Sequence, residues 1–391
     1  MPLRNLKVLD FSTLLPGPYA TMMMADLGTD VLRVEATERA DLLRQLPPFN
    51  ADGASYNHTY LNRSKRSIGL NLKEPEAVAI VEALVKEYDI VVEQFRPGVM
   101  ERFGLGYEAL RAINPRLIYC SITGFGQTGP YAGRPGHDLN YLAISGVASH
   151  TGRAGQGPLP LGVAVADIAG GSLLAMTGIL SAVIERQNSG LGQHIDISMT
   201  DAAFALNTFA GVSALNTKVE PGPGMMLNGG SFYDYYETAD GRYFSVAGLE
   251  PKFLQLLCGV LGRPDLLSKG LSQNPADHQE LREVLATTFK SQSFSYWQSV
   301  FADIEACVEP VLSVSEAAAH PQLRARGMVI ELREPGGKVQ RQVANPIRFS
   351  RNAHEYKFTG VELGAHTEEV LGQLGFDRNA MDTLRKKGVV G

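Results

Sequence analysis

Short apolar segments alternate with amphipathic segments along the first half of the chain. Runs such as "LKVLDFS" and "DIVVEQF" are almost uninterrupted, which is typical of strands buried in a parallel sheet. The longer segments between them repeat apolar positions at helical spacing. We predict strands over residues 6–12, 31–35, 89–95, 117–126 and 192–199, and helices over 17–30, 74–88, 107–116 and 166–187. This alternation indicates a doubly wound, Rossmann-like α/β domain with right-handed crossovers.

A loop rich in glycine and proline, residues 219–230, separates this region from one of different texture. Aromatic strands within residues 232–248 flank Asp240 and Gly241, a dipeptide that favours a hairpin turn. Helical segments follow at 250–261, 277–290 and 295–306, and the tail at 364–388 has the pattern of helices that pack back on an earlier part. We therefore predict a large α/β domain over 1–220, a smaller α+β domain over 221–330 and a C-terminal segment, 331–391, that returns to the large domain.

The composition is that of a globular protein and gives no sign of a nucleic-acid or membrane partner. The 391 residues are 44% hydrophobic and 20% charged, and the formal net charge of −5 provides no overall attraction to nucleic acid or anionic lipid. No leader or transmembrane run stands out in the sequence. Cys120, Cys258 and Cys307 are far apart and form no metal or redox spacing. We expect a cytoplasmic protein with no metal site.

Three titratable residues stand at predicted helix starts: His137, Asp167 and Glu250. Acids at such positions are often no more than helix caps, and a lone histidine is more often structural than catalytic. A helix N-terminus also favours a bound anion or a developing negative charge, so the same positions suit chemistry. Phosphate-binding glycine motifs and the Gly-x-Ser-x-Gly elbow are missing from the sequence. The residues alone predict a two-domain α/β enzyme with an anionic small ligand and leave its reaction open.

Ordered motifs over nearly the whole chain resemble the superfamily of family III CoA-transferases and α-methylacyl-CoA racemases. The matching stretches are "LKVLDFSTLLPGPYATMMMADLGTDVLRVE", "NRSKRSIGLNLK", "FRPGVMERFGLGYE", "LIYCSITGFGQTGPY", "GHDLNYLAISG", "ADIAGG" and "GQHIDISMTDAA". Within the superfamily, "GHDLNY", "ADIAGG" and "GLEPKF" resemble the racemase branch, because transferases typically lack the histidine of the first motif. The resemblance implies an interlocked homodimer in which each active site is shared between two chains.

The resemblance also implies a role for each candidate. His137 and Asp167 would remove and return the α-proton of a 2-methylacyl-CoA, and Glu250 of the partner chain would orient His137. Donors for the enolate oxygen are expected near Asp167 and Ile168, or near Asp138. The CoA moiety of the substrate, the one cofactor group implied, would contact Leu70, Asn71, Leu72, Lys73, Gln94, Phe95, Arg96, Arg102, Gly136, Asp138, Leu139, Asn140 and Tyr141.

Two alternatives stay open at this point. The stretch "PLPLGVAVADIAGG" looks more like the transferases, in which the residue that matches Asp167 is the nucleophile that carries an acyl group and then CoA. The third possibility is a protein that binds CoA without catalysis. His137→Ala would abolish α-proton exchange in a racemase and leave group transfer largely intact in a transferase.

Overall fold

A computed structural model describes residues 1–334 and 337–391, and the chain divides into two compact units. The first unit comprises Met1–Ser145, Leu161–Leu206 and Arg324–Gly391. The second comprises Gly146–Pro160 and Asn207–Leu323, so residues 146–160 and 207–220 of the predicted large domain cluster with the second unit, and residues 324–330 of the predicted small domain cluster with the first. Helix α15, Pro321–Ala325, spans the division.

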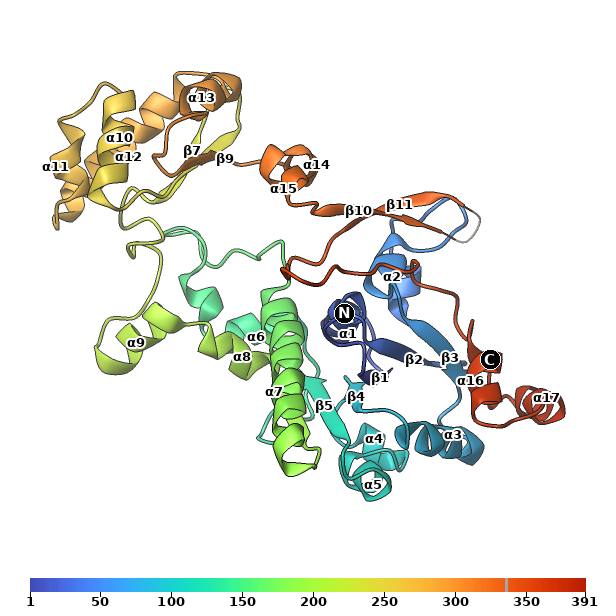
Figure 1. The fold of residues 1–391 in the computed structure, drawn as a ribbon. Helices are drawn as coiled ribbons and strands as arrows, with labels where there is room; N and C mark the ends of the chain where they lie inside the picture. The colour runs from blue at the N-terminus through green and yellow to red at the C-terminus, as the bar shows by residue number, and fades with distance from the viewer. Residues whose placement is uncertain (335–336) are drawn as a thin grey trace. The chain divides into compact units, whose positions relative to one another are not determined.

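Six parallel strands form the sheet of the first unit, in the order β3-β2-β1-β4-β5-β6 (Figure 1). Their bounds are β1 Lys7–Asp10, β2 Asp30–Ala36, β3 Arg66–Leu70, β4 Ile90–Glu93, β5 Ile118–Thr123 and β6 His194–Ser198. This is the strand order of doubly wound nucleotide-binding folds. The predicted α/β class and all five predicted strands are confirmed.

Strand β3 was missed because its five residues include an arginine and Gly69, which weaken the strand signal. Gly69 is needed there because the C-terminus of the chain crosses it (Figure 1). The Gly391 N–H donates to the Gly69 carbonyl oxygen at 3.1 Å, and a Cβ on Gly69 would lie 2.8 Å from the Gly391 oxygen. The strand is therefore fixed by a contact with the far end of the sequence.

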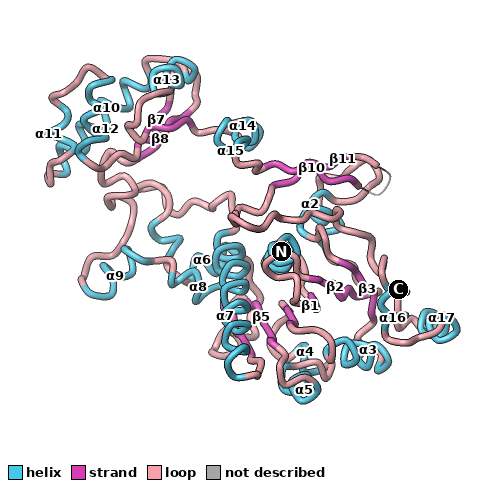
Figure 2. The backbone as a smooth tube through the Cα atoms, viewed as in Figure 1, coloured by secondary structure: helices cyan, strands magenta, loops and turns pink. Residues whose placement is uncertain are grey.

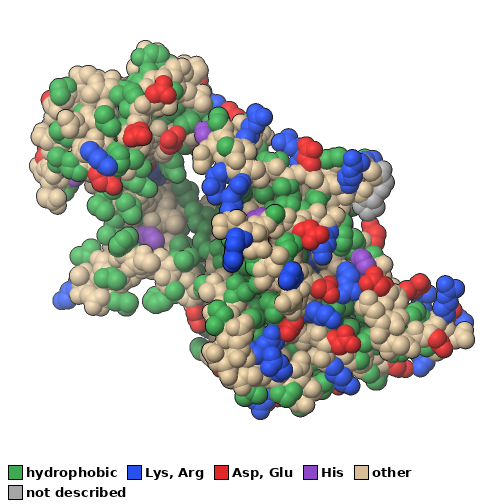
Figure 3. Space-filling model, viewed as in Figure 1, with side chains coloured by type: hydrophobic (Ala, Val, Ile, Leu, Met, Phe, Trp, Pro, Cys, Tyr) green, Lys and Arg blue, Asp and Glu red, His purple; other side chains and the backbone are tan. Residues whose placement is uncertain are grey.

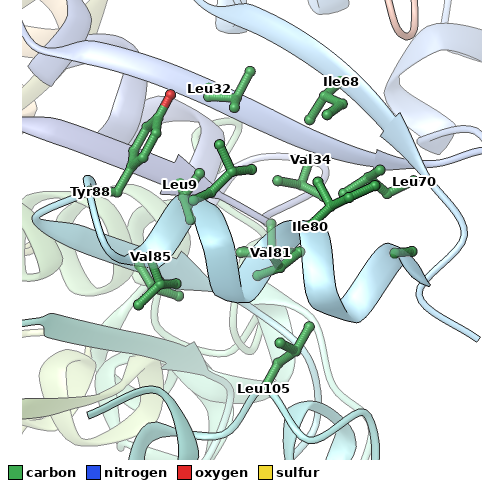
Figure 4. Packing of buried hydrophobic residues seen from close by; sticks show 14 of the residues in the cluster. Leu9, Leu32, Val34, Ile68, Leu70, Ile80, Val81, Val85, Tyr88 and Leu105 are labelled. Atoms are coloured by element: carbon green, nitrogen blue, oxygen red, sulfur yellow. The ribbon is translucent and has the colours of Figure 1, made fainter. Parts of the chain in front are cut away.

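Helices cover both faces of this sheet, as the doubly wound pattern requires. Apolar side chains of α3, including Ile80, Val81 and Val85, pack on Leu9 and Ile68 of the sheet (Figure 4). The tail joins the same core cluster, and α1 and α7 contact other strands. The helices are α1 Pro16–Asp26, η1 Leu42–Gln45, α2 Tyr56–Leu61, α3 Pro75–Val85, α4 Val99–Arg102, α5 Tyr107–Ile113, α6 Asp138–Ile144, η3 Ala166–Leu173, α7 Leu174–Ser189, α8 Met199–Ala205, α16 Thr367–Gln373 and α17 Arg378–Lys386, with a hairpin of β10 Val329–Arg333 and β11 Val339–Val343.

The long helix predicted over residues 166–187 is confirmed as a continuous helix, and its first part, η3, is wound as a π-helix before α7 begins. Two glycines let neighbouring helices approach η3: a Cβ on Gly170 would lie 3.0 Å from the Ala202 Cβ, and one on Gly171 would lie 2.9 Å from the Pro16 Cβ. The continuous helix, Ala166–Ser189, is long and apolar enough to span a membrane by length and composition, although the sequence analysis predicted no transmembrane run. One side of α7, with Ile179 buried, packs on β5 and β6 of the first unit.

The second unit combines an antiparallel sheet with helices. Strands β7 Asp234–Glu237 and β8 Tyr243–Val246 form the predicted hairpin, and β9 Val308–Pro310 pairs with β8 (Figure 2). Aromatic residues dominate its core, with Phe244 and Phe289 stacked at 5.9 Å between ring centroids. The helices are η2 Val147–His150, α9 Thr208–Asn216, α10 Pro251–Val260, α11 Leu266–Gly270, α12 Pro275–Lys290, α13 Phe294–Phe301 and α14 Val314–Ala319.

Candidate active site

The candidate site lies where the order of the strands reverses. β1 and β4 are neighbours, and the chain leaves them toward opposite edges of the sheet, which opens a crevice at their carboxyl ends. A cavity of about 260 Å³ occupies this position. It is lined by residues that follow three strands and by residues from the next segments: Leu14, Pro16, Gln94, Phe95, Arg96, Pro97, Ile122, Thr123, Gly124, Ala132, Arg134, Pro135, Gly136, His137, Tyr141, Asp167 and Met199.

His137 is the residue immediately before α6, and its side chain is exposed to solvent at the cavity. The Asn140 Oδ1 accepts a hydrogen bond from the His137 backbone N–H at 3.0 Å, which closes the first turn of the helix. The buried Tyr141 donates its hydroxyl to the Gly136 carbonyl oxygen. These two contacts fix the backbone on both sides of the imidazole, so the predicted "GHDLNY" stretch forms a defined wall of the cavity.

Asp167 is the second residue of η3 and lines the same cavity. Its backbone N–H donates to the Asp138 Oδ1 at 3.1 Å, which ties the start of η3 to the start of α6. Burial, the largest cause, and the negative charge of Asp138 raise the pKa of the Asp167 carboxyl to about 6, and the charge of His137 acts in the opposite sense. Asp167 can therefore hold or release a proton close to neutral pH.

Two of the three expected sources of enolate donors are already engaged. The Asp167 N–H is held by Asp138, and the Ile168 N–H donates to the Ala164 carbonyl oxygen at 2.9 Å. Of the expected donors for the enolate oxygen, these contacts therefore leave only those at the start of α6, near Asp138.

The predicted CoA contacts fall into separate groups. Gln94, Phe95, Arg96, Gly136 and Tyr141 line the cavity. Asp138, Leu139 and Asn140 lie in the first turn of α6 and do not line the cavity, and Arg102 ends α4. Of the segment that ends β3, Leu70 is fully buried, Leu72 packs against the core, and both Asn71 and Lys73 contact Glu38, the Lys73 Nζ at 2.5 Å.

A second cavity, of about 290 Å³, adjoins the first. The two share Leu14 and Phe95 in their linings, so Phe95 forms part of the wall between them. The second is lined by residues that follow β1, by the second half of β2 and by the loop after it, including the buried Arg33 of β2 and the exposed Arg39 of the loop. The Arg33 guanidinium is engaged by Asp41 and by Glu35, the latter at 3.1 Å.

Comparison with known proteins decides the family. The profile of CoA-transferase family III matches residues 3–367. The chain belongs to this family. A crystal structure of a CAIB/BAIF family protein from Brucella suis has the same fold, with a TM-score of 0.83, 32% sequence identity and coverage of 96% of this chain and 99% of that one. The family resemblance and the fold predicted from sequence are confirmed.

Curated relatives of this family III chain carry two different activities at equal distance. The chain is 36% identical to the alpha-methylacyl-CoA racemase of Homo sapiens, over 100% of this chain and 98% of that protein. It is also 36% identical to the succinate–glutarate CoA-transferase of Agrobacterium fabrum, over 95% of this chain and 96% of that protein. The chain is therefore an enzyme of the combined transferase and racemase group.

Glu250 belongs to the second unit of the family III chain and is exposed at the start of α10. Within the described part of the chain its carboxylate makes no capping hydrogen bond to α10, so a cap does not account for this acid. Its pairing with His137 of a partner stays a prediction. No three His, Cys, Asp or Glu side chains gather as a metal site in the residues that the structure describes.

Sequence reasoning missed Arg134 and Arg39, the exposed cations that line the first and second cavity. The Arg134 guanidinium lies 3.8 Å from the centre of the Tyr131 ring, which holds it by a cation–π contact. Both arginines lie in loops that follow parallel strands, Arg39 after β2 and Arg134 after β5, and that location at the carboxyl edge of the sheet was the available signal.

Proposed function

We propose that this chain racemises 2-methylacyl-CoA thioesters, interconverting the 2R and 2S forms by removal and return of the α-proton. One observation carries the proposal: His137 and Asp167, from the starts of two different helices, line one cavity at the switch point of the sheet. Racemisation needs a base and an acid of comparable proton affinity on the two faces of one carbon. A pKa of about 6 for Asp167 lies close to the ordinary value of a histidine, ~6.5.

In the proposed reaction, neutral His137 takes the α-proton of one enantiomer, and the electron pair of the broken C–H bond moves into the thioester as an enolate. Protonated Asp167 then delivers a proton to the opposite face, which inverts the carbon. For the other enantiomer, ionised Asp167 is the base and protonated His137 is the acid. General acid–base catalysis by one positioned group contributes about 10²–10⁴-fold, so enolate stabilisation near Asp138 must supply a further share.

The two adjoining cavities support a path for CoA. We propose that the thioester end occupies the first cavity and that the nucleotide end reaches past Phe95 into the second. Arg96 and Arg134 on the first cavity and Arg39 on the second would serve as forks for phosphate oxygens. Lys73, Arg102 and the other contacts implied by the family resemblance would complete the outer part of the site. No metal and no cofactor beyond CoA is needed for these steps.

We also propose that the enzyme is a homodimer with shared active sites, in which the partner's Glu250 orients His137. Large apolar side chains are exposed in both units, including Val163 at 60% and Phe209 at 83%. Figure 3 shows hydrophobic side chains gathered over α9, where Val212 and Leu215 are exposed as well. So much exposed apolar surface on one chain is typical of an interface that a partner covers.

A second candidate function is CoA transfer with Asp167 as the nucleophile. The stretch before Asp167 and the equal identity to a CoA-transferase favour it. In that reaction the ionised Asp167 attacks a donor thioester, CoA leaves as thiolate, and an acyl anhydride of Asp167 forms. CoA thiolate then attacks the aspartyl carbonyl, releases the donor acid and leaves an aspartyl-CoA thioester. The acceptor carboxylate attacks this thioester, which forms a second anhydride and releases CoA thiolate. The thiolate finally attacks the acceptor's acyl carbon, which gives the new acyl-CoA and regenerates Asp167.

The deciding experiment is NMR of (2R)- or (2S)-2-methyldecanoyl-CoA in deuterated buffer with catalytic amounts of the enzyme. Racemisation predicts loss of the α-proton signal with both enantiomers present at equilibrium. Transfer of CoA from a donor thioester to a free carboxylate, without α-exchange, would establish the alternative. Neither activity, alongside CoA binding, would leave a binding protein.

Two variants separate the roles within that experiment. His137→Ala should lower α-exchange by at least about 100-fold and leave transfer largely intact. Asp167→Asn should abolish transfer, because an amide cannot form the acyl anhydride. His150→Ala is a matched control, since His150 lies in η2 and hydrogen-bonds Asn207 at 2.8 Å, and it should leave either activity near that of the unmodified enzyme.

A further inference from the structure

Glu93, the last residue of β4, immediately precedes the segment 94–97, which contains Phe95, the residue that lies between the two cavities. The four residues after it, Gln94, Phe95, Arg96 and Pro97, all line the first cavity, whereas Glu93 lines neither. Its side chain is buried, with 4% of the residue exposed, and its Oε2 accepts a hydrogen bond from the Phe95 backbone N–H at 2.8 Å. We propose that Glu93 is a positioning residue that holds the Phe95 wall in the conformation that binds CoA.

The segment 94–97, called here the Phe95 wall, is held by hydrogen bonds at two consecutive residues, Gln94 and Phe95. The Gln94 Oε1 accepts a hydrogen bond from the Gly17 N–H at 2.9 Å, which ties the wall to the start of α1. The Glu93 carboxylate fastens the next residue, Phe95, whose ring packs partly against the main core cluster. Without the second hydrogen bond, Phe95 would be held less firmly between the cavities, and Arg96 would be held less firmly on the first cavity.

The surroundings of Glu93 do not explain the carboxylate as a structural ion pair. Within residues 1–334 and 337–391 it has no salt bridge. Its other partner is the Ser121 hydroxyl, the neighbouring position on β5. The Ser121 Oγ lies 2.9 Å from the His194 Nε2 on β6, so the imidazole can donate to Ser121 while Ser121 donates to Glu93. A buried acid held by donors alone, beside a ligand cavity, points to function.

Among the described residues, the titratable groups that act on Glu93 or lie beside it include Glu101 of α4, Tyr119 and Cys120 of β5, Asp196 of β6, and His194 beyond Ser121. None of these is a lysine or an arginine. Burial, the largest cause, together with Glu101 and Asp196 raises the pKa of Glu93 to about 7, and the hydrogen bonds from Ser121 and Phe95 act in the opposite sense. An ionised carboxylate accepts the Phe95 N–H more strongly than a neutral carboxyl does. The fastening should therefore tighten as pH rises through neutrality.

This inference rests on the proposed CoA site but not on the choice between racemase and transferase. Its test is the dissociation constant of free CoA, measured by calorimetry on the whole enzyme, for Glu93→Gln and Glu93→Met. The Gln variant keeps an oxygen that can accept from Phe95, so its constant should stay within about threefold. The Met variant loses the acceptor and should bind CoA about tenfold more weakly, with KM for the thioester raised in proportion and kcat nearly unchanged.

Asp89→Asn is the matched control. Asp89 precedes the other end of β4 and likewise accepts a backbone N–H, that of Lys7 at 2.9 Å, but it lines neither cavity. Its variant should alter thermal stability and leave CoA binding unchanged. Equal CoA binding by Glu93→Met and the unmodified enzyme would overturn the inference, as would equal weakening in Glu93→Gln and Glu93→Met. No CoA binding by the unmodified enzyme would instead refute the proposed function.

A second measurement tests the inference without Glu93→Met, in case that variant does not fold. The ratio of the CoA dissociation constants of the unmodified enzyme and Glu93→Gln should fall between pH 6 and pH 8, because only the former gains a carboxylate at Phe95 as pH rises. Taking the ratio removes the titration of the CoA phosphates and of every protein group other than residue 93, because both proteins share them. A ratio that is constant across this range would overturn the inference.

Discussion

Two buried carboxyl groups, Asp10 and Glu93, end the neighbouring strands β1 and β4, and their surroundings are opposite. Asp10 lies 3.2 Å from the Lys65 Nζ and accepts hydrogen bonds from Ser12 and Thr21. Burial alone would raise the pKa of Asp10, but Lys65, these two hydroxyls and Arg33 together lower it. Glu93 has a hydroxyl and an amide as donors and acids nearby, and burial raises its pKa to about 7.

This difference in surroundings distinguishes an acid with a structural role, Asp10, from an acid with a proposed functional role, Glu93, at the same edge of the sheet. A buried charge that is paired and fully hydrogen-bonded serves to hold segments together, and Lys65 indeed also donates to the Pro18 carbonyl oxygen at 2.9 Å and to Asn62 at 3.0 Å. A buried acid without a cation costs stability, so the residue is retained for another reason. Asp167 belongs with Glu93 in this respect, since burial and Asp138 both raise its pKa.

The largest effect is expected at the paired carboxylate. Lys65→Met leaves Asp10 charged, buried and without its cation, and should lower the free energy of unfolding by about 3–5 kcal/mol. Urea denaturation at pH 7 measures this. Lys7→Met is the matched control, because Lys7 and Glu87 form an exposed pair at 3.6 Å, and it should cost less than about 1 kcal/mol. A Lys65 variant as stable as this control would show that Asp10 does not depend on its lysine.

A smaller effect of opposite sign is expected at the unpaired carboxyl. The pKa of Glu93 is about 7 in the folded chain against an ordinary value of 4.5, so its stabilising contribution is complete below about pH 4.5 and is lost as pH rises through 7. Glu93→Gln removes this loss. Between pH 4.5 and pH 8, the free energy of unfolding of the variant should rise relative to that of the unmodified enzyme by an amount of the order of 2–3 kcal/mol. Denaturation curves measure the difference in stability between Glu93→Gln and the unmodified enzyme at pH 4.5 and at pH 8. An equal difference at both pH values would contradict the contrast drawn between Glu93 and Asp10.

The sequence was sufficient for what depends on local pattern and not for what depends on distant contacts. The buried strands and the α/β class follow from runs such as residues 89–95, and the hairpin follows from Asp240 and Gly241. Strand β3 is fixed by Gly391, at the opposite end of the chain, and the π-winding of η3 accompanies close contacts with Pro16 and Ala202. No window of sequence around either segment contains those partners.

The same limit applies to the candidate site. The positions of His137 and Asp167 at helix starts were predicted, because caps and small residues mark such starts. That the two line one cavity follows from the strand order, and the raised pKa of Asp167 follows from burial and from Asp138 across the cavity wall. The role of Glu93 could not be predicted from its segment: the Phe95 amide is only two residues away, but the burial of the carboxylate and its Ser121 partner on β5 depend on the folded sheet.

The smallest effect is expected where a charge is removed without its hydrogen bond. Asp138→Asn keeps an oxygen for the Asp167 N–H, now 3.1 Å from the Asp138 Oδ1, but removes the negative charge that raises the pKa of Asp167. The pKa of Asp167 should fall, by less than about one unit. In the direction in which Asp167 is the base, the rate rises with pH as Asp167 ionises, so the acidic limb of the pH–rate profile should move to lower pH. The opposite direction, which needs protonated Asp167, should lose activity at a lower pH as well. Limbs that stay in place would mean that burial alone sets the proton affinity of Asp167, and Asp138 would then act only by holding the start of η3.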